Sequence, residues 1–453
     1  MKVPTYSKYK PSRVAWLGDI PEDWYVKRGR FCMEINPQPV RLRELNPDDE
    51  VSFVPMEAVG EHGGLNLEQT RAITDISSGY TEFEDGDVIV AKITPCFENG
   101  KGARAAGLTN GVGFGTTELH VLRARSVDRQ FLFYLTISMP FRSNGRGEMY
   151  GAGGQKRVPP EFCKDFRVPL PRIEHQRTIA NFLDRETTKI DALVAKKRAL
   201  IEKLKEKRTA LISRTVTRGL PPDAARAAGL ERHPKMKPSG VAWLGDVPEH
   251  WRVPPLYTRY SIKLGKMLDE RRITGNHLVH YLRNVDVQWD RVEIDDLPEM
   301  DISKAERDRY TVKSGDLLVC EGGEVGRAGT VSDRAAGLGF QKALHRMRPL
   351  NSSEISRFMF YTLLWASQTG IFFAEGNPNT IDHLTGEKLR RYRFSAPPRF
   401  EQLALADFLD RETTKIDQMV TKVEAAIERL REYRAALITA AVTGKIDVRG
   451  AAA

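Results

Sequence analysis

The chain is 453 residues long, which is too long for one ordinary hydrophobic core, so two or three domains are expected. Charged residues make up 29% and hydrophobic residues 41%, a balance that is typical of folded globular proteins and argues against a disordered chain. The net charge of +10 favours a polyanionic partner such as nucleic acid, although many basic proteins bind none.

The cysteines and the N-terminal segment bear on where the protein works. Cys32, Cys96, Cys163 and Cys320 are scattered and form no Cys-x-x-Cys pair, so neither a zinc site nor a disulfide framework is indicated, and buried thiols in a reducing compartment are expected. Residues 1–10 lack an apolar signal core, and no apolar run approaches the length of a membrane span. We therefore expect a cytoplasmic protein without a membrane partner.

Two stretches of the chain occur twice. Residues 11–24 read PSRVAWLGDIPEDW, and residues 238–251 read PSGVAWLGDVPEHW. The ten letters FLDRETTKID occupy residues 182–191 and return unchanged at 408–417. Because both pairs are separated by nearly the same number of residues, the chain consists of two similar modules whose middles differ.

The expected elements of the two modules follow the same order. Short β-branched runs bounded by turn residues predict strands, and dense apolar runs predict buried helices. In the first module the strands are Val51–Val54, Gly86–Ile93 and Leu119–Leu122, and the helix is Phe131–Ser138. In the second module they are Asp316–Cys320 and Phe358–Ser367.

Each module ends in a long helix with a seven-residue repeat, which is typical of a coiled coil. We predict inter-helix packing for Leu183, Ile190, Leu204, Leu211, Leu409, Ile416, Val423, Leu430 and Leu437. Leu204 and Leu430 are expected to be buried between the helices. The second apolar track is expected to carry Leu193, Leu200, Met419 and Tyr433.

These elements predict an α+β fold in which two pseudo-symmetric α/β domains are joined by two long antiparallel coiled-coil helices. The domains comprise residues 1–173 and 238–398, and the spacer helices comprise residues 174–218 and 399–446. Residues 219–237, with two adjacent prolines, are expected to form a linker where the chain turns back.

Motifs for catalysis are not found in this chain. Gly111–Gly115 superficially resembles a cofactor loop, but no capped helix follows it, so a turn is predicted. Asn377–Thr380 lacks the second proline and the aromatic residue of an adenine methyltransferase motif. Asp87 and Lys92 have no matching lysine in the second module, which argues against a nuclease site. We identify no pair of histidines at helical spacing together with a carboxylate, so no metal site is predicted.

Basic and amide side chains among glycines are candidates for contacts with DNA, since glycine turns let the backbone and a cation approach phosphate. Ordinary solvated side chains remain the alternative for each of them. The candidates are Lys92, Lys101, Arg104, Gln155, Lys156 and Arg157 in the first module and Arg327, Lys342, Arg346, Asn377 and Asn379 in the second.

Several motifs together resemble the specificity subunits of type I restriction-modification systems. They are the Gly18–Trp24 motif, the Gly86–Val88 strand, the Gly153–Arg157 segment, Val168–Pro171 and the heptad helix, and Ser395–Pro398 repeats the proline-rich start of a helix. His175 departs from the family, which usually has glutamate there.

The resemblance implies two target recognition domains that each read one half of a bipartite DNA site, joined by helices that set the spacing and dock two copies of a methylation subunit. Those partners would carry S-adenosylmethionine and the adenine methylation chemistry, and motor-nuclease restriction subunits would cut. This chain itself would bind no cofactor and catalyse nothing.

Two other classes of function remain open. One is a coiled-coil scaffold whose globular heads bind protein, and the other is a degenerate fusion that retains methylation or nuclease activity. Steep weakening of duplex DNA binding with salt separates the DNA-binding subunit from the scaffold, and the absence of cofactor motifs argues against the fusion.

Overall fold

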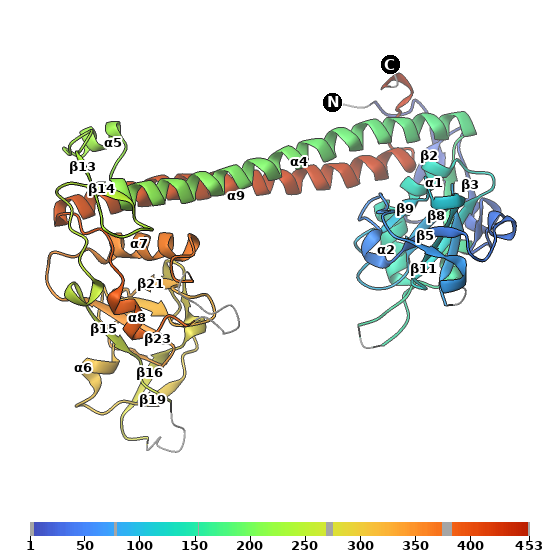
Figure 1. Ribbon diagram of the computed structural model, residues 1–453. Coiled ribbons are helices and arrows are strands. Elements are labelled where there is room, and N and C mark those ends of the chain that lie inside the picture. The colour runs from blue at the N-terminus through green and yellow to red at the C-terminus, as the bar shows by residue number, and fades with distance from the viewer. Residues whose placement is uncertain (1–3, 77–78, 153, 269–274, 374–382, 452–453) are drawn as a thin grey trace. The chain divides into compact units, whose positions relative to one another are not determined.

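The computed structural model describes residues 4–76, 79–152, 154–268, 275–373 and 383–451. Its contacts divide the chain into two compact units, Met1–Lys197 with Glu424–Ala453 (unit 1) and Arg198–Val423 (unit 2). Each unit contains a globular domain together with parts of two long helices, α4 (Ile173–Arg218) and α9 (Arg399–Val442) (Figure 1).

Unit 1 is built on two sheets that pack face to face, with Val54, Phe83, Ile89 and Val121 in the core between them. In the sheet β6-β5-β10-β7 strand β10 is parallel to β5, whereas β4-β11-β8-β9 is antiparallel throughout. Helix α1 covers the outer face of the second sheet. The bounds are β1 Tyr9–Pro11, β2 Asp19–Pro21, β3 Tyr25–Arg28, β4 Met33–Ile35, β5 Glu50–Val54, β6 Thr70–Ala72, β7 Thr81–Glu84, β8 Val88–Ala91, β9 Gly102–Arg104, β10 Val112–Gly115, β11 Leu119–Ala124, α1 Arg129–Thr136, α2 Met139–Gly147, α3 Pro160–Asp165 and β12 Arg167–Leu170.

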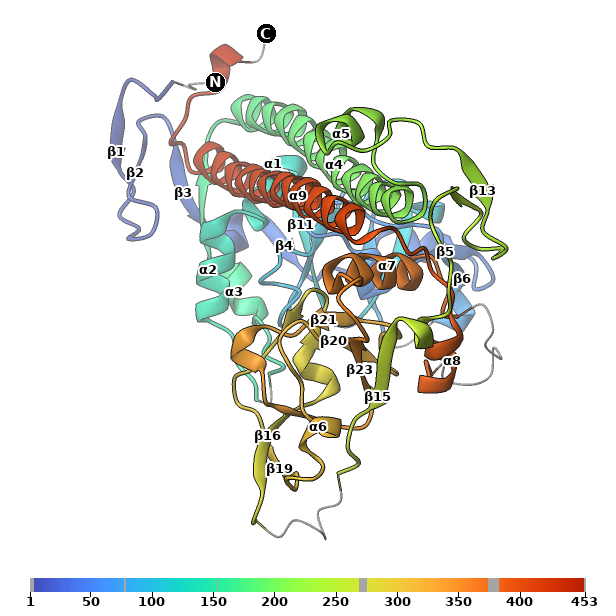
Figure 2. The same ribbon diagram turned by 90° about the vertical axis from the view of Figure 1, so that its left-hand side faces the viewer.

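Unit 2 repeats this plan. The sheet β19-β16-β22 again contains a parallel pair, β16 with β22, and the sheet β15-β23-β20-β21 is antiparallel. Helix α7 lies between the long helices and this sheet (Figure 2). The bounds are α5 Pro222–Ala227, β13 Met236–Pro238, β14 Asp246–Pro248, β15 Tyr260–Leu264, β16 Leu278–Leu282, β17 Val287–Gln288, β18 Arg291–Val292, β19 Glu299–Asp301, α6 Arg307–Tyr310, β20 Leu317–Cys320, β21 Ala328–Thr330, β22 Gly339–Phe340, β23 Leu344–Pro349, α7 Ser356–Gln368 and α8 Gly386–Arg391.

The same polar contact joins the domain to a long helix in both units. In unit 1 the Tyr134 hydroxyl of α1 donates to the Asp184 carboxylate of α4 at 2.6 Å. In unit 2 the Tyr361 hydroxyl of α7 donates to the Asp410 carboxylate of α9, also at 2.6 Å. Asp184 and Asp410 occupy equivalent positions in the repeated ten-letter motif. The duplication in the sequence is therefore also a duplication of tertiary contacts.

Helices α4 and α9 run antiparallel. In unit 1 Arg434 pairs with Asp191 at 3.2 Å, and in unit 2 Asp417 pairs with Arg208 at 3.1 Å, so residue numbers rise along one helix as they fall along the other. Of the predicted packing residues, the buried ones are Leu183, Ile190, Leu409, Ile416 and Leu437, and the half-buried ones are Leu204, Leu211, Val423 and Leu430. Leu204 and Leu430 are not fully enclosed because two helices leave their seam open at the sides.

The predicted second apolar track is wrong. Leu193, Leu200, Met419 and Tyr433 are exposed on the helices, with between 45% and 51% of each side chain accessible. The second track lies instead four residues after the first, at Val194, Ile201, Val420 and Ile427, of which the two isoleucines are buried. Apolar residues flank the first track on both sides, so the heptad alone could not decide between them.

The segment predicted as a linker is partly packed. Leu220 and Ala225 of this segment belong to the main hydrophobic core of unit 2, and α5 begins after Pro221. Proline at the first helical turn costs no hydrogen bond, since amides there lack intrahelical partners.

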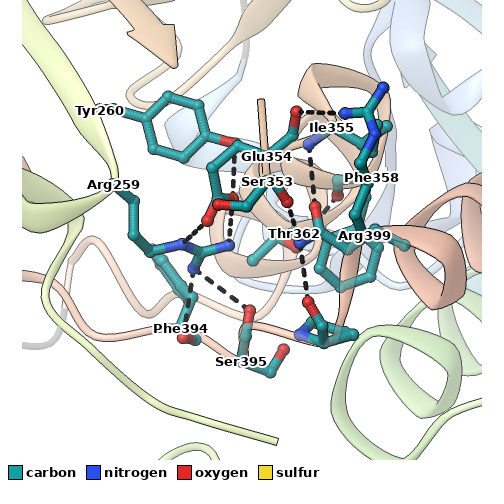
Figure 3. A network of polar contacts seen from close by, with 12 residues as sticks. Arg259, Tyr260, Ser353, Glu354, Ile355, Phe358, Thr362, Phe394, Ser395 and Arg399 are labelled. Atoms are coloured by element: carbon teal, nitrogen blue, oxygen red, sulfur yellow. Dashed lines mark hydrogen bonds and ion pairs between the residues drawn. The ribbon is translucent and has the colours of Figure 1, made fainter. Parts of the chain in front are cut away.

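A buried ion pair holds the start of α7 in unit 2 (Figure 3). The Arg259 guanidinium donates to both Glu354 carboxylate oxygens, at 2.9 and 2.7 Å, and to the Ser395 carbonyl at 3.2 Å. Its side chain is 4% exposed. At the equivalent positions of unit 1 stand the buried apolar side chains of Cys32 and Val127. The shared scaffold thus accepts either a buried ion pair or two apolar side chains at these positions.

None of the helices in the described residues combines the length and the apolar character that crossing a membrane requires.

Candidate nucleic-acid interface

Several candidate side chains of unit 1 gather at one end of the β4-β11-β8-β9 sheet, where β8 ends and β11 begins. The Lys92 amide, just after β8, donates to the Glu118 carbonyl at 2.9 Å, and the Lys92 carbonyl accepts from the Val158 amide at 2.9 Å. The Thr94 amide and hydroxyl both donate to the Lys156 carbonyl, at 2.9 and 3.0 Å. The loop after β8 and the segment 154–158 therefore form one surface.

Tyr150 and Arg157 form an isolated antiparallel bridge, and we call residues 148–152 and 154–158 on either side of it the Tyr150 hairpin. Tyr150 and Arg157 exchange two backbone hydrogen bonds, at 3.1 and 2.9 Å. The Arg157 guanidinium donates to both carboxylate oxygens of Glu118, at 2.9 and 2.7 Å. Hydrogen bonding to Arg157 lowers the pKa of Glu118, and the same bond raises the pKa of Arg157. Arg157 is thus engaged in holding the hairpin against the sheet.

The hairpin leaves other side chains in solvent. Gln155 and Lys156 are exposed, and Tyr150 is 62% exposed. Sequence reasoning missed Tyr150, although a tyrosine next to a glycine-rich, basic run was a usable signal, because aromatic rings stack on nucleotides. Glu118 was missed as well, and its role depends on a residue 39 positions away.

The structure separates two other candidates of unit 1 from this surface. Arg104 is exposed on β9, where it pairs with Val88 at the opposite end of β8 from Lys92. Lys101 is half-buried, and its ammonium group donates to the Met56 carbonyl at 3.0 Å. Lys101 therefore supports the turn that follows β5.

Arg327 has the same structural role in unit 2. Its guanidinium donates to the Asn284 carbonyl at 3.0 Å and to the Asn284 side-chain oxygen at 2.9 Å. Asn284 follows β16 just as Met56 follows β5, so Arg327 and Lys101 make equivalent contacts. These two cations hold turns within their domains.

Arg346 does not lie on the surface, so it cannot contact phosphate in this fold. It is 3% exposed and donates to the Asp308 and Thr311 carbonyls at 2.9 and 2.7 Å. Arg346 lies in the middle of β23, which is covered on both faces, and this burial explains why its charge is directed to backbone carbonyls.

Lys342 is the exposed candidate of unit 2, and its amide donates to the Lys266 carbonyl at 2.8 Å. Asn377 and Asn379 lie outside the described residues. Met267 and Leu268, beside Lys266, are 64% and 39% exposed. The sequence analysis did not predict this exposure, because large apolar side chains are usually buried.

A buried histidine lies under the surface in both units. The Nε2 atoms of His120 and His345 lie 2.8 Å from the Val158 and Leu384 carbonyls. Burial lowers the pKa of both rings, so they are neutral near pH 7 and Nε2–H donates to the carbonyl. Each histidine therefore holds a residue, Val158 or Leu384, whose amide also donates to the carbonyl of the residue just after β8 or β20.

We predicted a turn for the glycine-rich run Gly111–Gly115, and this prediction is wrong. The run contains the buried strand β10. A Cβ on Gly113 would lie 2.5 Å from the Phe83 ring, so glycine is required for close packing against the neighbouring strand β7. The prediction failed because a glycine that leaves space for a neighbouring aromatic ring cannot be distinguished in sequence from a glycine in a turn.

Asp87, the carboxylate considered above as part of a nuclease site, forms an ion pair with an arginine of the same domain. Asp87 accepts two hydrogen bonds from Arg123 at 2.8 Å, and Asp316 accepts two from Arg348 at 2.8 and 2.7 Å in unit 2. Among the described residues no group of three or more histidine, cysteine, aspartate or glutamate side chains could hold a metal ion.

The chain is similar to specificity subunits of type I restriction enzymes. No family model matches the chain. It is 38% identical over 164 residues to the type I restriction enzyme EcoAI specificity subunit and 37% identical over 168 residues to the EcoEI specificity subunit, both of Escherichia coli. Each match covers 36% of this chain, and they cover 27% and 28% of the two relatives, so the chain aligns with little more than a quarter of their length.

Solved structures extend the likeness to the fold. A chain from a structure of the type I R-M system, solved for its complex assembly and conformational transition, matches with a TM-score of 0.68 at 18% identity, covering 94% of this chain and 99% of that one. The HsdS subunit of Thermoanaerobacter tengcongensis matches with a TM-score of 0.57 at 18% identity, covering 94% and 98%. The resemblance to type I specificity subunits is thus confirmed, as is the fold of two domains and a pair of long helices.

Proposed function

We propose that this chain is the sequence-specific DNA-binding subunit of a type I restriction-modification complex. Unit 1 reads one part of a bipartite site and unit 2 reads the other. The observation that supports this division most directly is the shared scaffold, which carries different surface loops. Lys92 in unit 1 stands where unit 2 has Glu321, since the two residues make the same backbone contacts. Two readers on one scaffold suit two different half-sites.

Helices α4 and α9 dock two copies of a methylation subunit in this proposal. Leu193 and Leu200 lie seven residues apart on one face of α4, and both are exposed. Met419 and Tyr433 lie fourteen residues apart on one face of α9, and they too are exposed. Exposed apolar side chains in a row on a helix are typical of a surface that a partner covers. S-adenosylmethionine and the adenine methylation chemistry belong to those partners, and DNA cleavage belongs to motor-nuclease subunits, so this chain is not itself an enzyme.

The test is to assemble the chain with methylation subunits and to measure binding to duplex DNA across a salt series. We expect tight binding to one bipartite sequence and a steep loss of affinity with salt, because the basic surface releases counterions from phosphate. We also expect transfer of a labelled methyl group only when the methylation subunits are present.

Two outcomes would contradict the proposal. Methyl transfer by this chain alone would make it an enzyme. Binding that is independent of sequence and salt, together with capture of proteins by the globular domains, would favour the coiled-coil scaffold.

A further inference from the structure

The Tyr150 hairpin of unit 1 has a geometry suited to a groove of DNA. Its two segments, 148–152 and 154–158, are antiparallel and joined by the mutual backbone hydrogen bonds of Tyr150 and Arg157. At Gly151 the backbone has a φ of +130°, and a Cβ there would lie 2.7 Å from the Gln155 carbonyl oxygen. The close approach of the two segments therefore requires glycine. The major groove of B-DNA is wide enough to admit a two-stranded antiparallel ribbon.

The contacts that hold the hairpin divide its residues into two groups. Arg157 is occupied by the Glu118 carboxylate, and the Lys156 carbonyl accepts from Thr94. The side chains of Tyr150, Gln155 and Lys156 face solvent, and within the described parts of the chain the structure gives the Gln155 amide and the Lys156 ammonium no hydrogen-bond or ion-pair partner. The backbone is held to the sheet while an aromatic ring, an amide and a cation remain available.

We propose that the Tyr150 hairpin enters the major groove of the half-site that unit 1 reads, with Gln155 pairing with an adenine edge. A glutamine amide can donate to and accept from adenine N7 and N6 at once, which no other base matches. Lys156 contacts phosphate, and the Tyr150 ring packs against the sugar or base beside the read position. Arg157 is a positioning residue that acts through Glu118. This inference rests on the proposed function.

Unit 2 does not repeat this arrangement at the described positions. His383 and Ala343 occupy the places of Arg157 and Glu118, because the chain around them makes the same backbone hydrogen bonds. The carboxylate–guanidinium pair is thus a property of unit 1. A change in the hairpin should therefore alter one half of the recognised sequence, and the other half serves as an internal control for folding.

To test this, the full chain is expressed with its methylation subunits, and the methylated positions in the host DNA are determined by sequencing. For Gln155→Ala we expect one position in one half-site to become degenerate, with discrimination falling about 10- to 100-fold, since a bidentate base contact is lost. The other half-site stays unchanged. Tyr150→Ala should lower methylation of the same half without changing the other, and Arg157→Met should relax the same half.

Lys156→Gln is the matched test of the phosphate contact. It should reduce the dependence of log affinity on log salt by about one and leave the recognised sequence unchanged. Lys27→Gln, at an exposed lysine of β3 in the same unit, should leave both properties unchanged.

Two results would overturn the inference. One is that Gln155→Ala and Tyr150→Ala leave both half-sites unchanged, and the other is that they weaken both half-sites equally. A wild-type complex that recognises no defined sequence would instead contradict the proposed function, and the inference with it.

Discussion

Single residues in this protein show how one scaffold accepts different chemistry at the same place. The Arg259–Glu354 pair of unit 2 is buried, whereas unit 1 has Cys32 and Val127 at the equivalent positions. A buried ion pair gains attraction but loses the hydration of two charges, so its net contribution is small, while removal of one partner leaves a buried charge.

We therefore predict that Glu354→Leu alone destabilises the protein by about 3–5 kcal/mol. The double variant Arg259→Met with Glu354→Leu should recover most of this loss, because the remaining side chains are apolar, as in unit 1. Chemical denaturation of the three proteins measures the free energies of unfolding. A double variant as unstable as the single variant would show that the pair itself supplies stability.

A second prediction at the residue scale concerns pH. Burial, followed by the positive charge of Arg434, lowers the pKa of His62 to about 4. Because the unfolded side chain has a pKa of about 6.5, the unfolded state takes up the proton first as the pH falls. The stability due to neutral His62 is complete above pH 6.5 and is lost between pH 6.5 and 4, with about 2 kcal/mol lost by pH 5.

The measurement compares the pH dependence of unfolding for the wild type and for His62→Asn between pH 5 and 7. The variant should show a shallower loss of stability toward acid. Some loss remains, since burial also lowers the pKa of His120, His175 and His345. An unchanged slope would mean that His62 is protonated at its ordinary pKa.

At the scale of elements, the long helices use neighbouring leucines for different purposes. Leu204 is half-buried in the seam between α4 and α9, and Leu200, one turn away on the same helix, is 45% exposed. We predict that Leu204→Lys costs about 1–3 kcal/mol, because apolar burial is lost and a cation enters the seam. Leu200→Lys should change stability by no more than about 0.5 kcal/mol.

Thermal unfolding and binding of methylation subunits distinguish the two variants. Leu200→Lys should weaken subunit binding while the melting temperature stays near that of the wild type. Equal destabilisation by both substitutions would place Leu200 in the seam and contradict the observed helix pairing.

At the scale of the whole molecule, each unit has its own domain core and its own variable loops. We predict that exchanging residues 36–160 for the equivalent segment of a relative changes only one half of the recognised sequence. A donor that keeps Asp128 and Tyr134 preserves the contacts to α4, since Gln176 binds the Asp128 amide and Asp184 binds the Tyr134 hydroxyl. Methylome sequencing determines both halves of the recognised sequence in one measurement. A change in both halves would contradict the proposal that each unit recognises one of them.

Repeated positions of the chain could be predicted from the sequence, whereas variable positions could not. The two modules, the long helices and the main strands were predictable because they depend on local periodicity and on matching letters within the chain. The resemblance to specificity subunits depended on these repeated motifs and on the Gly153–Arg157 segment of the first module. The contents of the surface loops have no such pattern, and neither the recognised sequence nor its contacts follow from them.

What the sequence determined by itself was the duplicated α+β architecture and the heptad that pairs α4 with α9. The tertiary structure decided which of the candidate side chains are held within the fold and which are exposed. Arg346, Arg327 and Lys101 are held by backbone carbonyls 35–45 residues away, while Gln155 and Lys156 remain in solvent. It also decided which apolar track faces the seam. Burial and hydrogen bonding depend on residues that the fold brings together from distant positions, and a local pattern carries no information about those partners.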